Sequence, residues 1–288
     1  MAICWLAGTA VYICTNYRCM SAYFKNKTVV VTGGSDGIGK ALVENLLQQG
    51  AKVATCARSN DKLYDLQLQN ANRPLFTAVA DVSNEGDCKN FIESAAHHFG
   101  GVDILINNAG ISMRALFADA ELDTLRKLMD VNFWGTVYCS KFALPYIKQS
   151  KGDIAAISSI AGYRGLPGRC GYSASKFAVN GFMEALRTEL RTDGVNVLWI
   201  SPGFTASNIR KVALDKEGKP QGETPLDESK LMSSEECARH ILHAIEKRRR
   251  SLILTTNGKQ TVYMNKFLPG LADKLVHRFF FKNGQLIK

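Results

Sequence analysis

Two side chains that could move a proton stand four residues apart in the stretch GYSASKFAVNGF, residues 171–182. Residues at this spacing lie on the same face of an α-helix, so the Tyr172 phenol and the Lys176 ammonium would be neighbours. A free phenol has a pKa near ~10, and a fixed positive charge beside it favours the phenolate. The pair therefore predicts a proton donor or acceptor near neutral pH. An isolated YxxxK is also compatible with an exposed, solvated helix face.

A glycine-rich turn stands between an apolar β-branched run and a helical pattern, in TGGSDGIGK at residues 32–40. Strand, glycine turn and helix N-terminus together bind a pyrophosphate, because backbone amides and the positive end of the helix dipole converge there. The spacing is GxxxGxG rather than GxGxxG, and simple chain reversal is the alternative. The residues of this turn that we predict to contact a dinucleotide are Gly33, Ser35, Asp36, Gly37, Ile38 and Gly39.

The end of the second β-branched run, TCARSN, predicts which dinucleotide is bound. Ala57 stands where a site for an unmodified ribose has an acidic residue, and Arg58 follows it. A guanidinium there favours a 2'-phosphate, so the sequence predicts NADP(H) rather than NAD(H), with Arg58 and Ser59 as contacts. An exposed arginine after a strand is the plainer alternative.

The glycine turn, Arg58 and the Tyr172–Lys176 pair can form one site only in a fold that brings the ends of its strands together. Short β-branched runs alternate with helical segments, at residues 28–34, 52–58, 75–82, 102–110, 152–159, 195–203 and 251–256. Such alternation implies parallel pairing through right-handed crossovers. We predict an α/β fold with a doubly wound, parallel, seven-stranded Rossmann-type sheet, in a single domain over residues 25–258. Residues 204–231, rich in Lys, Gly, Pro and Glu, break the alternation and are expected to form a mobile lid.

The composition is that of a globular protein with an affinity for anions. The 288-residue chain has a formal net charge of +10, which fits a phosphorylated cofactor, an acidic lipid surface or nucleic acid. Its cysteines form no CxxC pair, which fits reduced thiols in a cytosolic compartment. They are Cys4, Cys14, Cys19, Cys56, Cys88, Cys139, Cys170 and Cys237.

Two terminal segments stand apart from this domain. Residues 1–24 begin with an apolar stretch without a charged side chain before Arg18. They predict either an anchor that associates a cytoplasmic catalytic domain with a membrane, or a start assigned too early, since Met20 opens a plausible shorter protein. Residues 259–288 form a basic amphipathic tail that could pack on its own domain, on a sister subunit or on a membrane surface. Its apolar residues at helical spacing are Phe267, Leu268, Leu271, Leu275 and Phe279.

Together these motifs resemble those of the short-chain dehydrogenase/reductase family, and in look its hydroxysteroid dehydrogenase-like, membrane-facing branch. The matching stretches occur in family order: TGxxxGxG at 32–39, NNAG at 107–110, Asn132 in VNFWGT, Ser159 in ISSIAGY, YxxxK at 172–176, and PG at 202–203. The resemblance implies further cofactor contacts at Asp81, Val82, Asn108, Ala109, Gly110, Tyr172, Lys176, Pro202 and Gly203, and it extends to Ser207, where the family often has Thr.

The resemblance also implies four catalytic residues. Ser159 would hydrogen-bond the substrate oxygen, Tyr172 would pass the proton, and Lys176 would lower the phenol pKa and hold the nicotinamide ribose. Asn132 would position a water that joins Lys176 to solvent. The neighbouring Ser158 points to the opposite side of the strand end and is expected to be structural.

The function that follows is an NADP(H)-dependent oxidoreductase interconverting a ketone or aldehyde and an alcohol by hydride transfer, with a lipophilic, steroid- or lipid-like small-molecule substrate. Two alternatives stay open: a 3-oxoacyl-(acyl carrier protein) reductase, whose carrier is acidic, and a non-catalytic nucleotide-binding sensor. Family habit implies a homodimer or homotetramer through helices that begin near Val131 and Tyr172.

Two other clusters are weighed and set aside. Cys237, His240 and His243 lie three apart, but this spacing drifts around a helix and no second ligand group is evident, so no metal is expected. The run EKRRR at residues 246–250 could bind nucleic acid. Cations at a helix C-terminus oppose the helix dipole favourably, so nucleic acid is not the expected partner.

Overall fold

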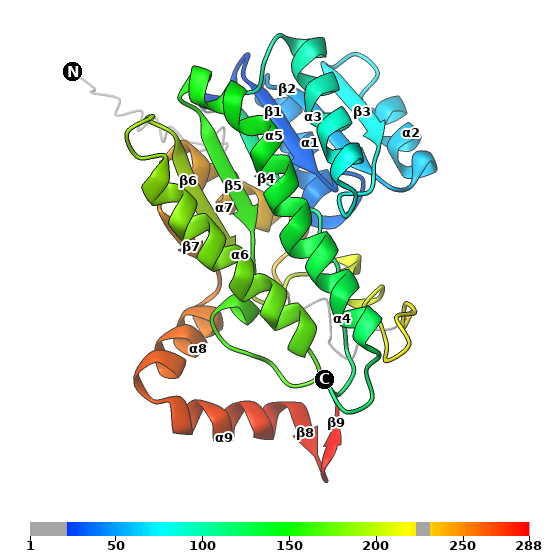
Figure 1. The fold of residues 1–288 in the computed structure, drawn as a ribbon, viewed down its shortest axis with the longest axis vertical. Helices are drawn as coiled ribbons and strands as arrows, with labels where there is room; N and C mark the ends of the chain where they lie inside the picture. The colour runs from blue at the N-terminus through cyan, green and yellow to red at the C-terminus, as the bar shows by residue number, and fades with distance from the viewer. Residues whose placement is uncertain (1–21, 223–230, 288) are drawn as a thin grey trace, which may run out of the picture.

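A seven-stranded parallel sheet forms the centre of the protein, in a computed structural model that describes residues 22–222 and 231–287. The strand order is β3-β2-β1-β4-β5-β6-β7, so the chain reverses its direction of winding between β1 and β4 (Figure 1). This confirms the doubly wound, Rossmann-type prediction. The strands are β1 Thr28–Thr32, β2 Lys52–Ala57, β3 Leu75–Val79, β4 Ile104–Asn107, β5 Asp153–Ile157, β6 Asn196–Ser201 and β7 Ser251–Ile253.

Helices cover both faces of this sheet. Side chains of α1, α2 and α7 pack on one face, and those of α3, α4, α5 and α6 pack on the other. The bounds are α1 Gly37–Gln48, α2 Asn60–Gln69, α3 Glu85–Phe99, α4 Leu122–Met129, α5 Gly135–Ser150, α6 Cys170–Glu189 and α7 Ser234–Glu246. Between α4 and α5 the chain forms one π-helical turn, Asp130–Trp134.

The central strands are buried on both sides because most of their positions carry apolar or small residues, and polar exceptions such as Asn107 of β4 and Asp153 of β5 are hydrogen-bonded. In β1, Val30 packs on the α3 and α5 side, whereas Val29 and Val31 pack on the α1 and α7 side. Val30 pairs with Ala54 of β2 and with Leu105 of β4. This two-sided burial is what a parallel sheet with helices on both faces requires.

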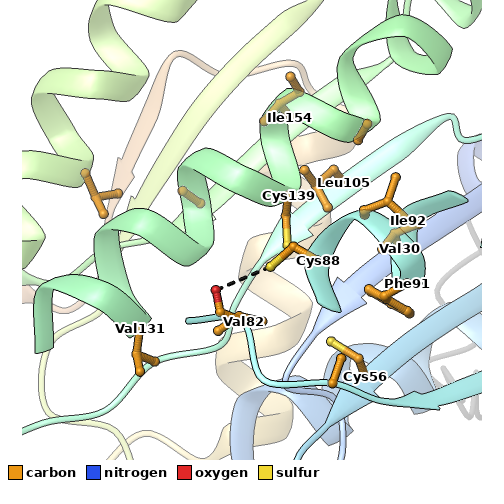
Figure 2. Close-up of a cluster of buried hydrophobic side chains, with 14 of the residues drawn as sticks. Val30, Cys56, Val82, Cys88, Phe91, Ile92, Leu105, Val131, Cys139 and Ile154 are labelled. Atoms are coloured by element: carbon orange, nitrogen blue, oxygen red, sulfur yellow. Dashed lines mark hydrogen bonds between the residues drawn. The ribbon is translucent and has the colours of Figure 1, made fainter. Parts of the chain in front are cut away.

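A cluster of buried thiols lies on the α3 and α5 side of the sheet. Figure 2 shows Cys139 of α5 pointing toward Cys88 of α3, whose Sγ donates to the Val82 carbonyl over 3.3 Å. Burial raises the pKa of Cys56 to about 12, and a hydrogen bond with Cys88 together with burial raises that of Cys139 well above its usual range. The five cysteines of the described residues are free thiols, as predicted.

The C-terminal part of the chain forms two helices, α8 Thr256–Phe267 and α9 Pro269–Phe280, below the sheet in Figure 1. They end in a hairpin of β8 Phe281–Lys282 and β9 Gln285–Leu286. The helical spacing predicted for this tail is interrupted at Leu268, because Pro269 opens a new helix and cannot continue the old one. The predicted boundary between residues 258 and 259 falls inside α8.

The described part of the predicted lid is tied to the loop after β4. Leu214 donates its amide to the Ser112 carbonyl and accepts from the Arg114 amide, both over 2.8 Å. The residues around Leu214 therefore form a wall beside the carboxyl end of β4. Residues 223–230 of this segment and residues 1–21 of the predicted N-terminal segment 1–24 lie outside the described part, so both the mobility and the anchor stay predictions.

We expect Gly34→Ala to destabilise the fold, because a Cβ at Gly34 would lie 2.0 Å from Thr55 Oγ1 and 2.8 Å from Val43 Cγ2. Such overpacking of a buried site costs about 1–3 kcal/mol. A matched control is Gly181→Ala on the exposed face of α6, where a Cβ would meet nothing within 4 Å. The control should gain up to about 1 kcal/mol from helix propensity. Urea unfolding measures both, and equal stability of the Gly34→Ala variant and the parent would contradict the packing.

Candidate functional site

One cleft of about 1000 Å³ runs along the carboxyl ends of the strands. All parallel strands point to this edge, which is where open α/β sheets bind ligands. Every residue predicted to contact the cofactor lines the cleft: Gly33, Ser35, Asp36, Gly37, Ile38, Gly39, Arg58, Ser59, Asp81, Val82, Asn108, Ala109, Gly110, Tyr172, Lys176, Pro202 and Gly203. Ser159 and Ser207 line it as well.

The glycine turn after β1 has the backbone shape of a phosphate cradle. Gly33 and Gly37 have positive φ, +69° and +51°, which side chains of L-residues rarely adopt. A Cβ at Gly39 would lie 2.0 Å from the Gly33 carbonyl oxygen, so only glycine permits this closeness. The turn therefore holds backbone and the N-terminus of α1 at the cleft, where a pyrophosphate would fit.

The NNAG motif fixes the other side of this turn. The Asn108 amide group donates to the Thr32 and Gly33 carbonyls over 2.9 and 3.1 Å. The Thr32 hydroxyl in turn accepts the backbone amides of Asn108 and Ala109, both over 3.0 Å. These four bonds lock the ends of β1 and β4 together at the point where the winding reverses.

The end of β2 and the start of α2 carry positive charge into the cleft. Arg58 is exposed, and Ser59 caps α2 by accepting from the Lys62 amide. Lys62 also reaches Asp36, the N-cap of α1, with a 2.5 Å ion pair. Burial would raise the pKa of Asp36, but hydrogen bonds from Lys62 and Asn208 outweigh it and the pKa falls. Lys62 and Asn208 line the cleft and were not singled out from the sequence.

Tyr172 and Lys176 lie in the first turns of α6 and both face the cleft. The Lys176 ammonium donates to the Ile157 carbonyl at the end of β5 over 2.8 Å and lies 5.8 Å from the centre of the Tyr172 ring. A Cβ at Gly110 would stand 3.5 Å from this ammonium, so the glycine leaves space beside it. The spacing of four has placed both groups in one site.

The electrostatics differ from the expectation that Lys176 lowers the phenol pKa. Burial raises the pKa of Tyr172 above its usual value, and the effects that lower it come from a Ser159 hydrogen bond and from the charges of Arg169 and Arg210. Burial also lowers the pKa of Lys176 to about 8. The loss of solvation thus dominates at both groups, because both are withdrawn from water.

Ser159 and Ser158 have separate roles. Ser159 follows β5, accepts the Ala161 amide over 3.1 Å and lies near enough to Tyr172 to lower the pKa of its phenol. Ser158 is buried, and its hydroxyl donates to the Lys176 backbone carbonyl over 3.4 Å. Both serines line the cleft, the buried Ser158 ties the end of β5 to α6, and the catalytic role of Ser159 stays a prediction.

Asn132 lies behind the cleft, in the π-helical turn before α5. Its side chain accepts the Ile111 amide over 2.8 Å and donates to the Ile111 carbonyl and to the Ser175 hydroxyl, over 3.0 and 2.9 Å. It is 1% exposed and does not line the cleft itself. The geometry gives it a positioning role between the loop after β4 and α6; its role toward a water stays a prediction.

Two arginines at the cleft were missed by sequence reasoning. Arg169 precedes α6, one turn before Tyr172, and Arg210 lies in the predicted lid; they are 6% and 5% exposed. The spacing of three between Arg169 and Tyr172 was a signal that could have been used. For Arg210 there was no such signal, because its place depends on how the segment folds back.

The C-terminal helices supply an apolar wall to the same cleft. Its residues are Met264, Leu275, Val276, Phe279 and Phe280. The wall is held by close packing of Gly258 on Ile160 and by Arg164, which donates to Asn265 over 2.8 Å and pairs with Asp273 over 2.6 Å. The amphipathic pattern of this tail was visible in the sequence, but its docking place was not.

Other predictions concern features away from the cleft. In the described residues no group of His, Cys, Asp and Glu could hold a metal, and His240 and His243 lie beside Glu236 and Glu246 instead. None of the described helices could span a membrane. Dimers or tetramers and contact with a membrane surface stay predictions.

The sequence model of the short chain dehydrogenase family matches residues 27–218. The chain belongs to this family. Mouse "Dehydrogenase/reductase SDR family member 7B" is 33% identical to it over 263 residues, covering 88% of this chain and 81% of the mouse protein. "11-beta-hydroxysteroid dehydrogenase-like 2" of Arabidopsis thaliana is 38% identical over 194 residues, covering 65% of this chain and 63% of the plant protein.

Solved structures show the same fold. A short chain dehydrogenase/reductase from Burkholderia phymatum in complex with NAD has a TM-score of 0.77 at 22% identity, covering 86% of this chain and 96% of its own. A short-chain dehydrogenase from Streptomyces avermitilis has a TM-score of 0.76 at 24% identity, covering 90% of this chain and all of its own. Membership of the short chain dehydrogenase family makes this protein an oxidoreductase that uses a nicotinamide cofactor, and the residues that hold the cofactor stay predictions.

Lys176→Met should change how stability depends on pH. The folded pKa of Lys176, about 8, lies below the unfolded value of 10.5, so the unfolded chain binds more protons between these values. Stability from this group therefore rises with pH above 8, by about 1 kcal/mol between pH 8 and pH 9. Urea unfolding without nucleotide should show this rise in the parent relative to the variant. A pH-independent difference between the two proteins would contradict the lowered pKa.

Proposed function

We propose that this protein catalyses NADPH-dependent reduction of a lipophilic ketone or aldehyde, and the reverse oxidation of the alcohol. In the forward direction a carbonyl compound, NADPH and a proton give an alcohol and NADP⁺. The observation that carries the proposal is the grouping of Ser159, Tyr172 and Lys176 in one cleft with the glycine turn. The family supplies the reaction class; the cofactor and the substrate are argued from this chain's own residues.

NADP(H) is favoured by the charge around the end of β2. Arg58 lines the cleft, and Lys62 lies one turn into α2 on the same side of it. Ala57 follows the last buried residues of β2 and offers no carboxylate to hold a ribose 2'-hydroxyl. A 2'-phosphate would gain charge-assisted hydrogen bonds from a guanidinium at this place.

A lipophilic substrate is favoured by the C-terminal wall. Leu275, Val276 and Phe279 of α9 line the cleft. Phe204 after β6 packs on Phe279, with ring centres 6.3 Å apart. An apolar wall of this extent suits a substrate with a large hydrocarbon part. The names of the curated relatives, which include hydroxysteroid dehydrogenase-like proteins, support the same substrate class.

The bound cofactor supplies the hydride, and the protein's task is orientation and proton transfer. Ser159 and Tyr172 both line the cleft, and Ser159 lies near enough to lower the pKa of the phenol, so a carbonyl oxygen that accepts from both hydroxyls would be polarised by both. Tyr172 holds the proton that the developing alkoxide takes up. Lys176, fixed by the Ile157 carbonyl, places a cation beneath the phenol, and Asn132 fixes the turn of α6 that carries it through Ser175.

The two alternatives differ in measurable ways. A 3-oxoacyl carrier protein reductase would turn over a carrier-linked 3-oxoacyl substrate faster than hydrophobic ketones. A nucleotide sensor would bind the cofactor without turnover. The presence of the complete set of Asn132, Ser159, Tyr172 and Lys176 supports the enzyme, since a sensor needs only the glycine turn.

We predict that Tyr172→Phe abolishes most of the turnover, because the proton donor is removed while the ring remains. The loss should be about 10²- to 10⁴-fold in kcat with a panel of hydrophobic ketones. NADPH affinity, followed by fluorescence titration, should change little. Unchanged NADPH oxidation by the variant would refute the catalytic assignment, and cofactor binding without turnover in the parent would favour the sensor.

We predict that Arg58→Asp reverses the cofactor preference. The carboxylate would repel a 2'-phosphate and accept from a ribose 2'-hydroxyl, so the Kd for NADPH should rise at least about tenfold while that for NADH changes little or falls. Arg73→Asp, at an exposed site outside the cleft, makes the same change of charge and serves as the control. Equal affinities of the unmodified protein for the two cofactors would count against the assignment.

A further inference from the structure

A buried guanidinium without a carboxylate partner lies beside the proton donor. Arg169 is 6% exposed, and its Nη1 donates to the Ser112 hydroxyl over 3.4 Å. Its Nε has no hydrogen-bond partner within the described residues, and none of the ion pairs found there includes it. A buried charge in this state is costly unless something pairs with it.

The position of Arg169 directs that charge into the substrate end of the cleft. Arg169 is the residue before α6 and lines the cleft together with Ser112 and Tyr172. The N-terminus of α6 has no side-chain cap here, so the positive end of a 20-residue helix adds to the guanidinium. The charges of Arg114 and Arg210 are near enough to oppose protonation of Arg169 and lower its pKa, after burial.

The cofactor does not explain this charge. Its pyrophosphate would lie at the glycine turn, and a 2'-phosphate would lie at Arg58, at the end of β2. The end that would lie at Tyr172 is the nicotinamide, which carries no negative group. An anion beside Arg169 would therefore belong to the substrate.

We propose that Arg169 binds a negatively charged group of the substrate, so that this protein acts on ketones that carry a carboxylate or phosphate near the carbonyl and a hydrocarbon chain beyond it. The inference rests on the proposed function and narrows its substrate class. The planar guanidinium would hold the oxyanion through two hydrogen bonds, from Nε and from an Nη nitrogen. The hydrocarbon would lie along Leu275, Val276 and Phe279 of α9.

The test compares matched ketones that differ only in charge. One pair is a long-chain 4-oxoalkanoate and its methyl ester; the other is a long-chain ketone phosphate monoester and the corresponding hydroxyketone. The pair with the larger ratio of kcat/KM between its charged and neutral members shows whether the preferred anion is a carboxylate or a phosphate. The parent protein should show a higher kcat/KM for the charged member of at least one pair. Arg169→Gln should lower kcat/KM for the charged member roughly 10- to 100-fold more than for the neutral member, because only the charged member loses its partner while both feel the loss of charge beside Tyr172.

Control variants separate binding of the substrate anion from an effect of the Arg169 charge on the Tyr172 phenol. Arg191→Gln removes an exposed arginine just beyond α6, outside the cleft, and should leave both members unchanged. Arg169→Lys keeps the charge without the planar fork and should fall between the parent and Arg169→Gln. An equal loss for charged and neutral ketones would overturn the proposal, because Arg169 would then act only on the phenol. Absence of any preference in the parent would overturn it too.

A binding measurement keeps the inference distinct from the catalytic proposal. Calorimetry of tetradecanoate, tetradecyl phosphate and tetradecanol with the NADP⁺ complex requires no turnover. Tighter binding of an anionic amphiphile by the parent, lost in Arg169→Gln, would support the anion site even if no ketone is reduced. Equal binding of all three by the parent would overturn the anion site and leave the reductase assignment intact. Thermal unfolding of each variant checks that it is folded.

Discussion

The hydrogen bond from the Lys176 ammonium to the Ile157 carbonyl fixes the two residues proposed for proton transfer, Tyr172 and Lys176, to the central sheet. It ties the second turn of α6 to the carboxyl end of β5 and holds a cation that is almost entirely withdrawn from water. Tyr172 stands one turn earlier on the same face, so its place over the cleft follows from this bond. Asn132 secures the same region of α6 through its hydrogen bond to Ser175.

The protonation states of Tyr172 and Lys176 depend more on the loss of solvation than on the attraction between the two groups. Burial favours the neutral phenol and the neutral amine, and it outweighs the charges of Arg169 and Arg210 at Tyr172. A neutral phenol is the state that can give a proton to a carbonyl oxygen. The arrangement thus keeps the donor loaded, and the positive groups around it stabilise the phenolate that remains after transfer.

The parts that the sequence predicts well are those with local causes. The β-branched runs predict the positions of all seven strands. The turn of Gly33, Gly37 and Gly39 predicts the phosphate cradle, because glycine is the residue that permits a positive φ and a close approach of the backbone. The place of Arg210 and the docking of α9 depend on how distant segments fold back, and no local pattern encodes that. The residue type of Pro269 is enough to predict a break in the helix, but it does not predict the direction of the helix that follows.

The apolar wall lies outside the part of the chain that carries the family pattern, which ends at residue 218. The two helices that carry it contact the loop after β5 through Gly258 against Ile160 and through the bonds of Arg164 to Asn265 and Asp273. Substitutions in α8 and α9 would therefore change the shape of the cleft wall and leave the positions of Tyr172 and Lys176 unaltered. Access to the cleft and the reaction within it are thus governed by separate elements of the chain.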